Sequence, residues 1–179
     1  MPLTVTVITL TVLVLFNMAL SFAIIRRLRE HEDRFGTSTP VAVGGPEPGD
    51  PMPAVETRAT DGSPVRTEAL RGRRTLIGFF STTCSACTVT APRFSEEARK
   101  LTGEGIRVIA VLSSAGNGDD AALRGMLGQS AQLVVEAPGG VLATAFSPRA
   151  LPSFFLVDPQ GRVAAKGLTM DSCLSAAAS

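Results

Sequence analysis

The sequence predicts an α/β domain in which a central mixed β-sheet is flanked by helices, preceded by an apolar N-terminal segment. Short apolar runs rich in Val, Ile, Leu and Phe alternate with stretches of helical spacing, which is typical of layered α/β domains. Near the C-terminus, two strand-like runs flank the turn Asp158-Pro159-Gln160-Gly161. A hairpin at that point makes the sheet mixed rather than wholly parallel.

The pattern places each element along the chain. Helices are expected at 89–101, 121–127, 141–146 and 170–178, with a single helical turn at 68–72. The expected strands are 55–59, 64–66, 76–80, 106–112, 133–135, 154–157 and 162–166.

The segment from Leu3 to Ile25 contains no charged residue. As a helix it is about 35 Å long, enough to cross a bilayer with some tilt. A cleaved signal peptide is the competing interpretation, but such peptides usually carry basic residues ahead of the apolar run, and none precedes this one. We therefore expect residues 3–25 to be a single-pass transmembrane anchor, with the lipid bilayer as a partner.

Residues 26–53 are expected to connect this anchor to the domain. The first part has mixed charges and continues the helical pattern, which predicts a juxtamembrane helix. Proline and glycine are frequent from Gly36 to Pro53, a composition typical of a semi-extended linker. The folded domain is then expected to occupy residues 54–179.

Charge and ligand types argue against nucleic-acid and metal binding. The formal net charge is only +1, so no excess of basic residues favours a nucleic acid. The single histidine, His31, lies outside the expected domain and far in sequence from any cysteine. A structural zinc site needs two ligands beyond one cysteine pair, and a copper-delivery module needs a wider cysteine spacing and a histidine in the folded domain. We expect no metal.

A C-x-x-C motif, Cys84-Ser85-Ala86-Cys87, follows a strand and opens a helix. Helix N-termini present unpaired N–H groups and the positive end of the helix dipole, and both stabilise a thiolate. Cys84 is therefore the expected nucleophile. Cys87, about one turn further on, is placed to attack a mixed disulfide and release the substrate. The dithiol is itself the redox group, so no cofactor is expected.

Over about residues 50–170 the chain resembles membrane-anchored thioredoxin-fold proteins of the TlpA/ResA type. A looser resemblance, including the anchor, links it to the thioredoxin-like accessory protein of methylamine utilisation. The shared features are Gly62, the turn at 70–72, the strand–Cys84–Cys87–helix unit, Pro92, the run 151–158 and Gly161.

The resemblance implies a thioredoxin-like fold and a function. Leu151-Pro152 becomes a cis-proline loop beside the two sulfurs, with an ordinary trans proline as the alternative. The backbone of Leu151 is then expected to pair with a substrate segment as a β-strand does. The implied activity is that of a membrane-tethered thiol–disulfide oxidoreductase that reduces or exchanges disulfides in protein substrates. Such an enzyme draws electrons from a redox partner.

Three positions depart from the family pattern. Thr83 stands where a Trp usually precedes the first cysteine, Gly78 where thioredoxins bury an acid, and Thr90 where ResA-type proteins have a Glu. Proton transfer then relies on water, on another carboxylate such as Glu96, or on the substrate. The losses favour an alternative function, in which the domain is a non-catalytic interaction or maturation module for a membrane-associated partner.

Two further interpretations concern the cysteines. A peroxidase of the peroxiredoxin class uses P-x-x-x-T-x-x-C, but Ile77 and Ser81 occupy the Pro and Thr positions relative to Cys84. Cys173 is the odd cysteine. We expect it to be a small, buried, inert thiol, with a resolving or intermolecular disulfide as the alternative.

Two observations give opposite predictions for the side of the membrane on which the domain lies. Arg26, Arg27, Arg29 and Arg34 follow the expected span and no basic residue precedes it, which places the domain in the cytoplasm by the positive-inside rule. The resemblance implies the opposite face, where tethered thioredoxin folds act on exported proteins. We expect an extracytoplasmic domain, with the cytoplasmic side as the alternative.

Overall fold

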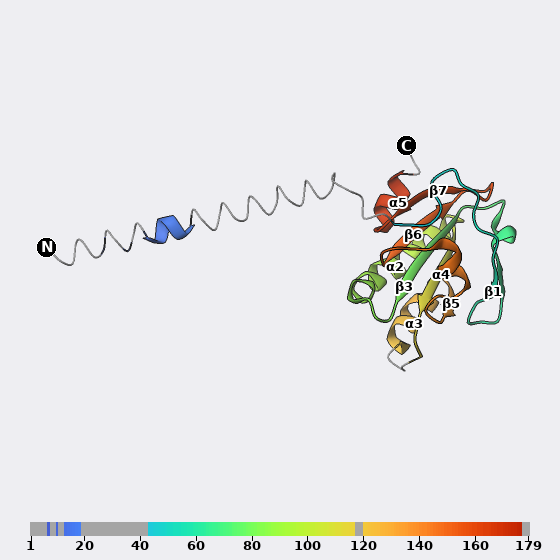
Figure 1. The fold of residues 1–179 in the computed structure, drawn as a ribbon, viewed down its shortest axis with the longest axis horizontal. Coiled ribbons are helices and arrows are strands. Elements are labelled where there is room, and N and C mark those ends of the chain that lie inside the picture. The colour runs from blue at the N-terminus through green and yellow to red at the C-terminus, as the bar shows by residue number, and fades with distance from the viewer. Residues whose placement is uncertain (1–6, 8–9, 11–12, 19–42, 117–119, 177–179) are drawn as a thin grey trace. The chain divides into compact units, whose positions relative to one another are not determined.

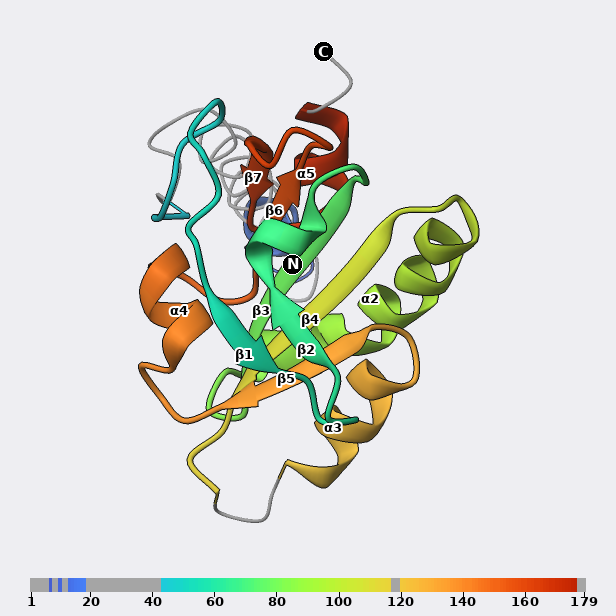
Figure 2. The same ribbon diagram turned by 90° about the vertical axis from the view of Figure 1, so that its right-hand side faces the viewer.

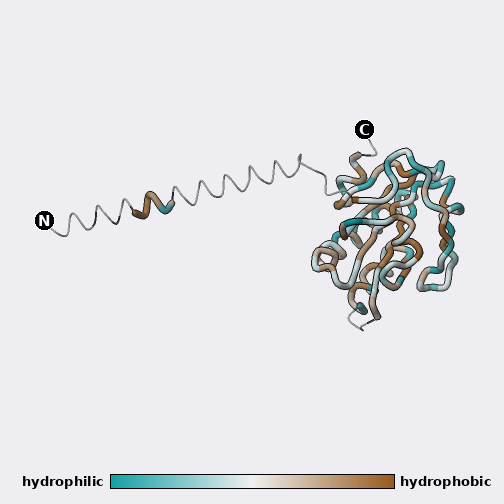
Figure 3. Tube along the Cα trace, viewed as in Figure 1, coloured by the Kyte–Doolittle hydropathy of each residue, from teal (hydrophilic) through white to brown (hydrophobic). Residues whose placement is uncertain are grey.

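The computed structural model describes residues 7, 10, 13–18, 43–116 and 120–176. The chain divides into two compact units, Met1–Val41 and Ala42–Ser179. In the first unit, residues 13–18 are helical and mostly hydrophobic (Figure 3). Their large apolar side chains are exposed. Within the described part of the chain, no helix is long and apolar enough to cross a membrane. Most of the expected anchor, and all of 26–42, lies outside the described residues.

The second unit is built on a five-stranded sheet with strand order β5-β4-β3-β6-β7 (Figure 1). The strands β3 (Thr75–Ser81), β4 (Arg107–Ser113) and β5 (Gln132–Glu136) are mutually parallel. The strand β6 (Ser153–Val157) runs antiparallel to β3, and β7 (Val163–Gly167) runs antiparallel to β6. The predicted mixed sheet and its closing hairpin are confirmed.

Helices and a hairpin cover the two faces of this sheet (Figure 2). One face packs against α2 (Ser85–Gly103), α3 (Ala121–Gly128) and α5 (Met170–Ala176). The other carries α4 (Val141–Phe146) and the antiparallel pair β1 (Glu56–Arg58) and β2 (Pro64–Arg66), followed by a 3-10 turn at Thr67–Leu70. Side chains alternate along a strand, so β3, which is buried along its whole length, supplies side chains to both faces.

The predicted linker is wrong for its last part, residues 43–53. Val43 is buried, and its carbonyl accepts a hydrogen bond from the Arg149 N–H at 2.8 Å. Further along, the Gly49 N–H donates to the Val163 carbonyl and the Val163 N–H donates to the Asp50 carbonyl, at 2.8 and 2.9 Å. Composition suggested a free tether, but backbone hydrogen bonds do not depend on apolar side chains. This Pro/Gly-rich segment is held to the edge strand β7.

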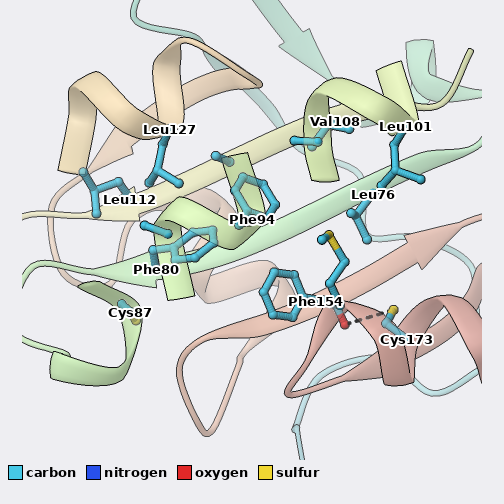
Figure 4. Packing of buried hydrophobic residues seen from close by; sticks show 14 of the residues in the cluster. Leu76, Phe80, Cys87, Phe94, Leu101, Val108, Leu112, Leu127, Phe154 and Cys173 are labelled. Atoms are coloured by element: carbon cyan, nitrogen blue, oxygen red, sulfur yellow. Dashed lines mark hydrogen bonds between the residues drawn. The ribbon is translucent and has the colours of Figure 1, made fainter. Parts of the chain in front are cut away.

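The rings of Phe80, Phe94 and Phe154 pack together on the α2 face of the core (Figure 4). Ring centroids of Phe80 and Phe94 lie 4.9 Å apart, and those of Phe94 and Phe154 lie 6.0 Å apart. A Cβ at Gly78 would lie 3.0 Å from the Phe80 ring and 3.2 Å from each of the other two. The position where thioredoxins bury an acid is thus closed here by three phenylalanines.

Cys173 is a residue of α5 and is fully buried (Figure 4). Its Sγ donates weak hydrogen bonds to the carbonyls of Phe154 and Ala165, at 3.6 and 3.5 Å. Burial raises the pKa of this thiol to about 11. The predicted burial of Cys173 is therefore confirmed.

We expect Gly78→Ala to lower the free energy of unfolding by about 1–3 kcal/mol, because the added methyl group overpacks the three rings. Gly78→Asp should lower the free energy of unfolding further, since it also buries a carboxyl group among apolar atoms. Urea unfolding measures both. Gly125→Ala is the matched control, because a Cβ there meets nothing within 4 Å and the change should be neutral or stabilising. An unchanged midpoint for Gly78→Asp would contradict the packing.

Candidate functional site

The two cysteines lie where β3 ends and α2 begins. Cys84 is the N-cap residue of α2, with extended backbone, and its Sγ accepts a hydrogen bond from the Cys87 N–H at 3.2 Å. The apolar β3 is buried along its whole length, so it fixes the point from which the motif emerges. The strand–loop–helix order predicted for the motif is confirmed.

Hydroxyl groups shape the short loop ahead of Cys84. The Oγ atoms of Ser81 and Thr83 lie 3.0 Å apart and share a hydrogen bond, and the Thr83 N–H donates to the Ser81 Oγ at 3.2 Å. The Thr82 N–H donates to the carbonyl of Ser113 at the end of β4, at 3.1 Å. Thr83 therefore helps to form the turn at the position where related proteins carry Trp, and Ser81 uses its hydroxyl in the same turn.

The Leu151–Pro152 loop lies against Cys84. Its peptide bond is cis, as predicted. The Cys84 thiol donates a hydrogen bond to the Leu151 carbonyl at 3.3 Å, joining residues that are far apart in the sequence. The sulfur of Cys84 thus sits between one backbone N–H and one backbone carbonyl.

The two thiols differ in exposure, and burial changes the pKa of the second. Cys84 is partly exposed, whereas Cys87 is 0% exposed and belongs to the core under α2. Burial, and secondarily the hydrogen bond with Cys84, raises the pKa of Cys87 to about 12. At neutral pH Cys87 is a thiol, and it must lose its proton before it can attack a disulfide.

Glu96, the carboxylate suggested by the sequence, does not replace the acids missing at Gly78 and Thr90. Glu96 is exposed, lies within 3.5 Å of Lys100, and stands about 13 Å beyond Cys87 along the helix axis. It is too distant to accept the proton of Cys87 directly. Asp171, which lines a cavity with Thr90, is exposed and pairs with Arg93 at 2.5 Å. Among the described residues, no cluster of three or more His, Cys, Asp or Glu residues is placed to hold a metal.

A cavity of about 440 Å³, with Leu151 among its lining residues, was not predicted from the sequence. It lies between the carboxyl ends of β3 and β4 and the helix α4 with its flanking turns. The small and apolar residues that form it carry no motif, so only the fold reveals it. Its lining residues are Phe79, Phe80, Val111, Ser113, Pro138, Gly139, Ala143, Thr144, Ser147, Pro148 and Leu151.

Comparison with known proteins finds one family and many solved structures of the same fold. A family model described as "AhpC/TSA family" matches residues 48–166. The thioredoxin domain of a thiol-disulfide oxidoreductase from Bacteroides vulgatus superposes with a TM-score of 0.61 at 21% identity, covering 72% of this chain and 94% of that one. No curated protein matches the chain.

Two further structures are similar. A pneumococcal exposed lipoprotein thioredoxin from Streptococcus pneumoniae has a TM-score of 0.55 at 22% identity, covering 70% of this chain and 98% of its own. A secreted disulfide oxidoreductase from Mycobacterium tuberculosis has a TM-score of 0.56 at 16% identity, with 70% and 95% covered. These likenesses show that the second unit has a thioredoxin-like α/β fold.

We expect iodoacetamide at pH 7 to modify Cys84 alone in the reduced native protein, because Cys87 and Cys173 are buried and have raised pKa values. Peptide mass spectrometry of the labelled protein identifies the site, and labelling in urea should recover all three cysteines. Equal labelling of Cys84 and Cys87 in the native protein would overturn the assignment of the exposed thiol.

Proposed function

The chain belongs to the AhpC/TSA family, and from this membership and the site geometry we propose that it is a thiol–disulfide oxidoreductase acting on protein substrates. One observation carries the proposal: a partly exposed Cys84 caps a helix directly above a buried Cys87. An exposed first thiol and a buried second thiol are what a two-step exchange reaction needs, since one must meet the substrate and the other only its partner.

In the first step, the Cys84 thiolate attacks one sulfur of a substrate disulfide. The substrate S–S bond breaks, a mixed disulfide forms through Cys84, and the second substrate sulfur leaves as a thiolate. The Cys87 N–H, 3.2 Å from the Cys84 sulfur, stabilises negative charge on that sulfur before the attack. The Leu151 carbonyl accepts the Cys84 thiol hydrogen in the protonated state.

In the second step, Cys87 loses its proton and attacks the Cys84 sulfur. A Cys84–Cys87 disulfide forms and the first substrate sulfur leaves, so two electrons pass from the protein to the substrate. Because Gly78 and Thr90 supply no base, the proton of Cys87 goes to water or to the departing substrate thiolate. A dithiol redox partner must then reduce the Cys84–Cys87 disulfide for a further turnover.

The substrate backbone is proposed to pair with Leu151, next to Pro152. The Leu151 carbonyl already faces the Cys84 sulfur at 3.3 Å, so a chain that lies along this loop presents its disulfide to the nucleophile. Leu151 and Pro152 are accordingly proposed as substrate-binding residues, with Cys84 and Cys87 as catalytic residues.

A non-catalytic maturation module is the second candidate function. The observation that favours it is the closed, aromatic surrounding of Gly78, which leaves Cys87 without the acid that thioredoxins bury there. A Cys84→Ser/Cys87→Ser variant separates the two candidates: restored function in cells would favour binding, and lost function would favour redox chemistry.

We further propose that residues 3–25 anchor the protein in the cell membrane, as in the TlpA/ResA type, with the thioredoxin-like domain outside the cytoplasm. The apolar run supports the anchor. Two structural neighbours are described as an exposed lipoprotein and as a secreted oxidoreductase, which favours the extracytoplasmic side. Because Val43 is already buried in the domain, we place the end of the proposed linker before it.

The second step should depend steeply on pH. With the pKa of Cys87 raised to about 12, its thiolate fraction and hence the rate of resolution should rise about tenfold per pH unit between pH 7 and pH 9. Stopped-flow release of a fluorescent thiol from its mixed disulfide with Cys84 measures this rate. In Cys87→Ser the mixed disulfide should persist at every pH. A flat profile in wild type would mean that a local base takes the proton.

Fusion reporters test the membrane side. A C-terminal alkaline phosphatase fusion should be active and a C-terminal green fluorescent protein fusion dark, because phosphatase matures outside the cytoplasm and the fluorescent protein does not mature after export in an unfolded state. Fluorescence without phosphatase activity would contradict an extracytoplasmic domain. That outcome would not contradict the proposed redox chemistry.

A further inference from the structure

We propose that the cavity beside Leu151 is a specificity pocket, which takes an apolar side chain next to the reacting cysteine of a protein substrate. This inference rests on the proposed function, since it assumes that Cys84 forms a mixed disulfide. The pocket is the cavity of about 440 Å³ defined above.

Leu151 connects the pocket to the chemistry. The same residue lines the cavity and places its carbonyl 3.3 Å from the Cys84 sulfur. In an extended chain, neighbouring residues are about 3.3 Å apart along the strand axis and their side chains alternate in direction. A substrate strand lying along Leu151 therefore brings the side chains that flank its cysteine to the mouth of this cavity.

The lining of the pocket favours an uncharged side chain. Phe79, Val111 and Leu151 supply apolar surface, and the only polar side chains among the lining residues are the hydroxyls of Ser113, Thr144 and Ser147. No charged residue lines the cavity, so a charged side chain entering it would lose its hydration without gaining an ion pair. An aliphatic or aromatic side chain gains the free energy of burial.

The size of the pocket fits one large side chain or a few small ones. Its volume lies near the lower end of the roughly 300–1,000 Å³ typical of small-ligand pockets. Ala143 keeps one wall open, because a larger residue at this position of α4 would enter the space. A single substitution can therefore fill the pocket without touching Cys84 or Pro152.

The wall formed by α4 is fixed in place. The buried carboxylate of Glu136 accepts hydrogen bonds from the N–H groups of Leu142 and Ala143, at 2.9 and 3.2 Å. A Cβ at Gly140 would lie only 2.4 Å from the Glu136 side chain, so the chain passes tightly over that carboxylate. A pre-formed wall binds a side chain without first having to become ordered.

The turn that follows α4 is held by the segment after Val43. Gly44 forms a β-bridge with Pro148, and Lys166 donates hydrogen bonds to the carbonyls of Gly44 and Gly45, at 3.2 and 3.5 Å. A Cβ at Gly45 would overlap the Phe146 carbonyl, so the contact depends on glycine. The turn that carries Ser147 and Pro148 is thus fastened on its outer side.

The test compares two disulfide-linked peptides that differ only in the residue after the cysteine, Phe in one and Ser in the other. The full-length protein in detergent should react about ten to a hundred times faster with the Phe peptide, which corresponds to the burial of one such side chain. Ala143→Phe should reduce that preference to near unity. Its rate with glutathione disulfide, which has no side chain for the pocket, should stay at the wild-type value.

Val141→Phe is the matched control, because Val141 lies on the same helix, is 55% exposed and does not line the pocket. It should keep the wild-type preference. Ala143→Leu provides a milder filling should Ala143→Phe fail to fold, as judged by circular dichroism, and should at least halve the preference. Equal wild-type rates for the two peptides, or an unchanged preference in Ala143→Leu, would contradict the proposed role of the pocket in specificity. No exchange with any disulfide would instead overturn the proposed oxidoreductase function.

Discussion

The contact on which the site depends is the one between the Cys84 sulfur and the Leu151 carbonyl, at 3.3 Å. It joins the strand–helix unit of β3 and α2 to the loop ahead of β6, which pairs with β3 in the sheet. The sheet register therefore decides which loop meets the cysteines. The same register leaves Leu151 shared between the sulfur and the apolar cavity, so the nucleophile and the proposed specificity pocket have one common wall.

The site has an unequal pair of thiols and no nearby acid. Cys84 is partly exposed and Cys87 is buried, and three phenylalanines enclose Gly78. Attack by Cys84 needs little from the protein beyond the helix N-terminus. Before Cys87 can attack the mixed disulfide, a proton must leave a buried thiol. We therefore expect this second step to be the slower one near neutral pH.

The alternation of apolar strands with helices, together with the turn signals, predicted the order of the elements from β1 to α5. The C-x-x-C motif predicted the strand–cysteine–helix unit, and the family resemblance implied the cis-proline loop at Leu151-Pro152. Two features escaped prediction for physical reasons. Residues 43–53 attach through backbone hydrogen bonds, which leave no trace in side-chain composition. The pocket is formed by small side chains such as Ala143 and Thr144, whose meaning depends on neighbours distant in the sequence. The distance of Glu96 from Cys87 likewise follows from helix geometry and not from any motif.

The central claim is that Cys84 and Cys87 together carry two electrons to a substrate. The most direct test is an anaerobic titration of the reduced protein with a disulfide substrate, followed by peptide mass spectrometry. The account predicts that each chain reduces one substrate disulfide, gains a Cys84–Cys87 disulfide and keeps Cys173 as a thiol. A substrate left oxidised, or a product disulfide that includes Cys173, would contradict it.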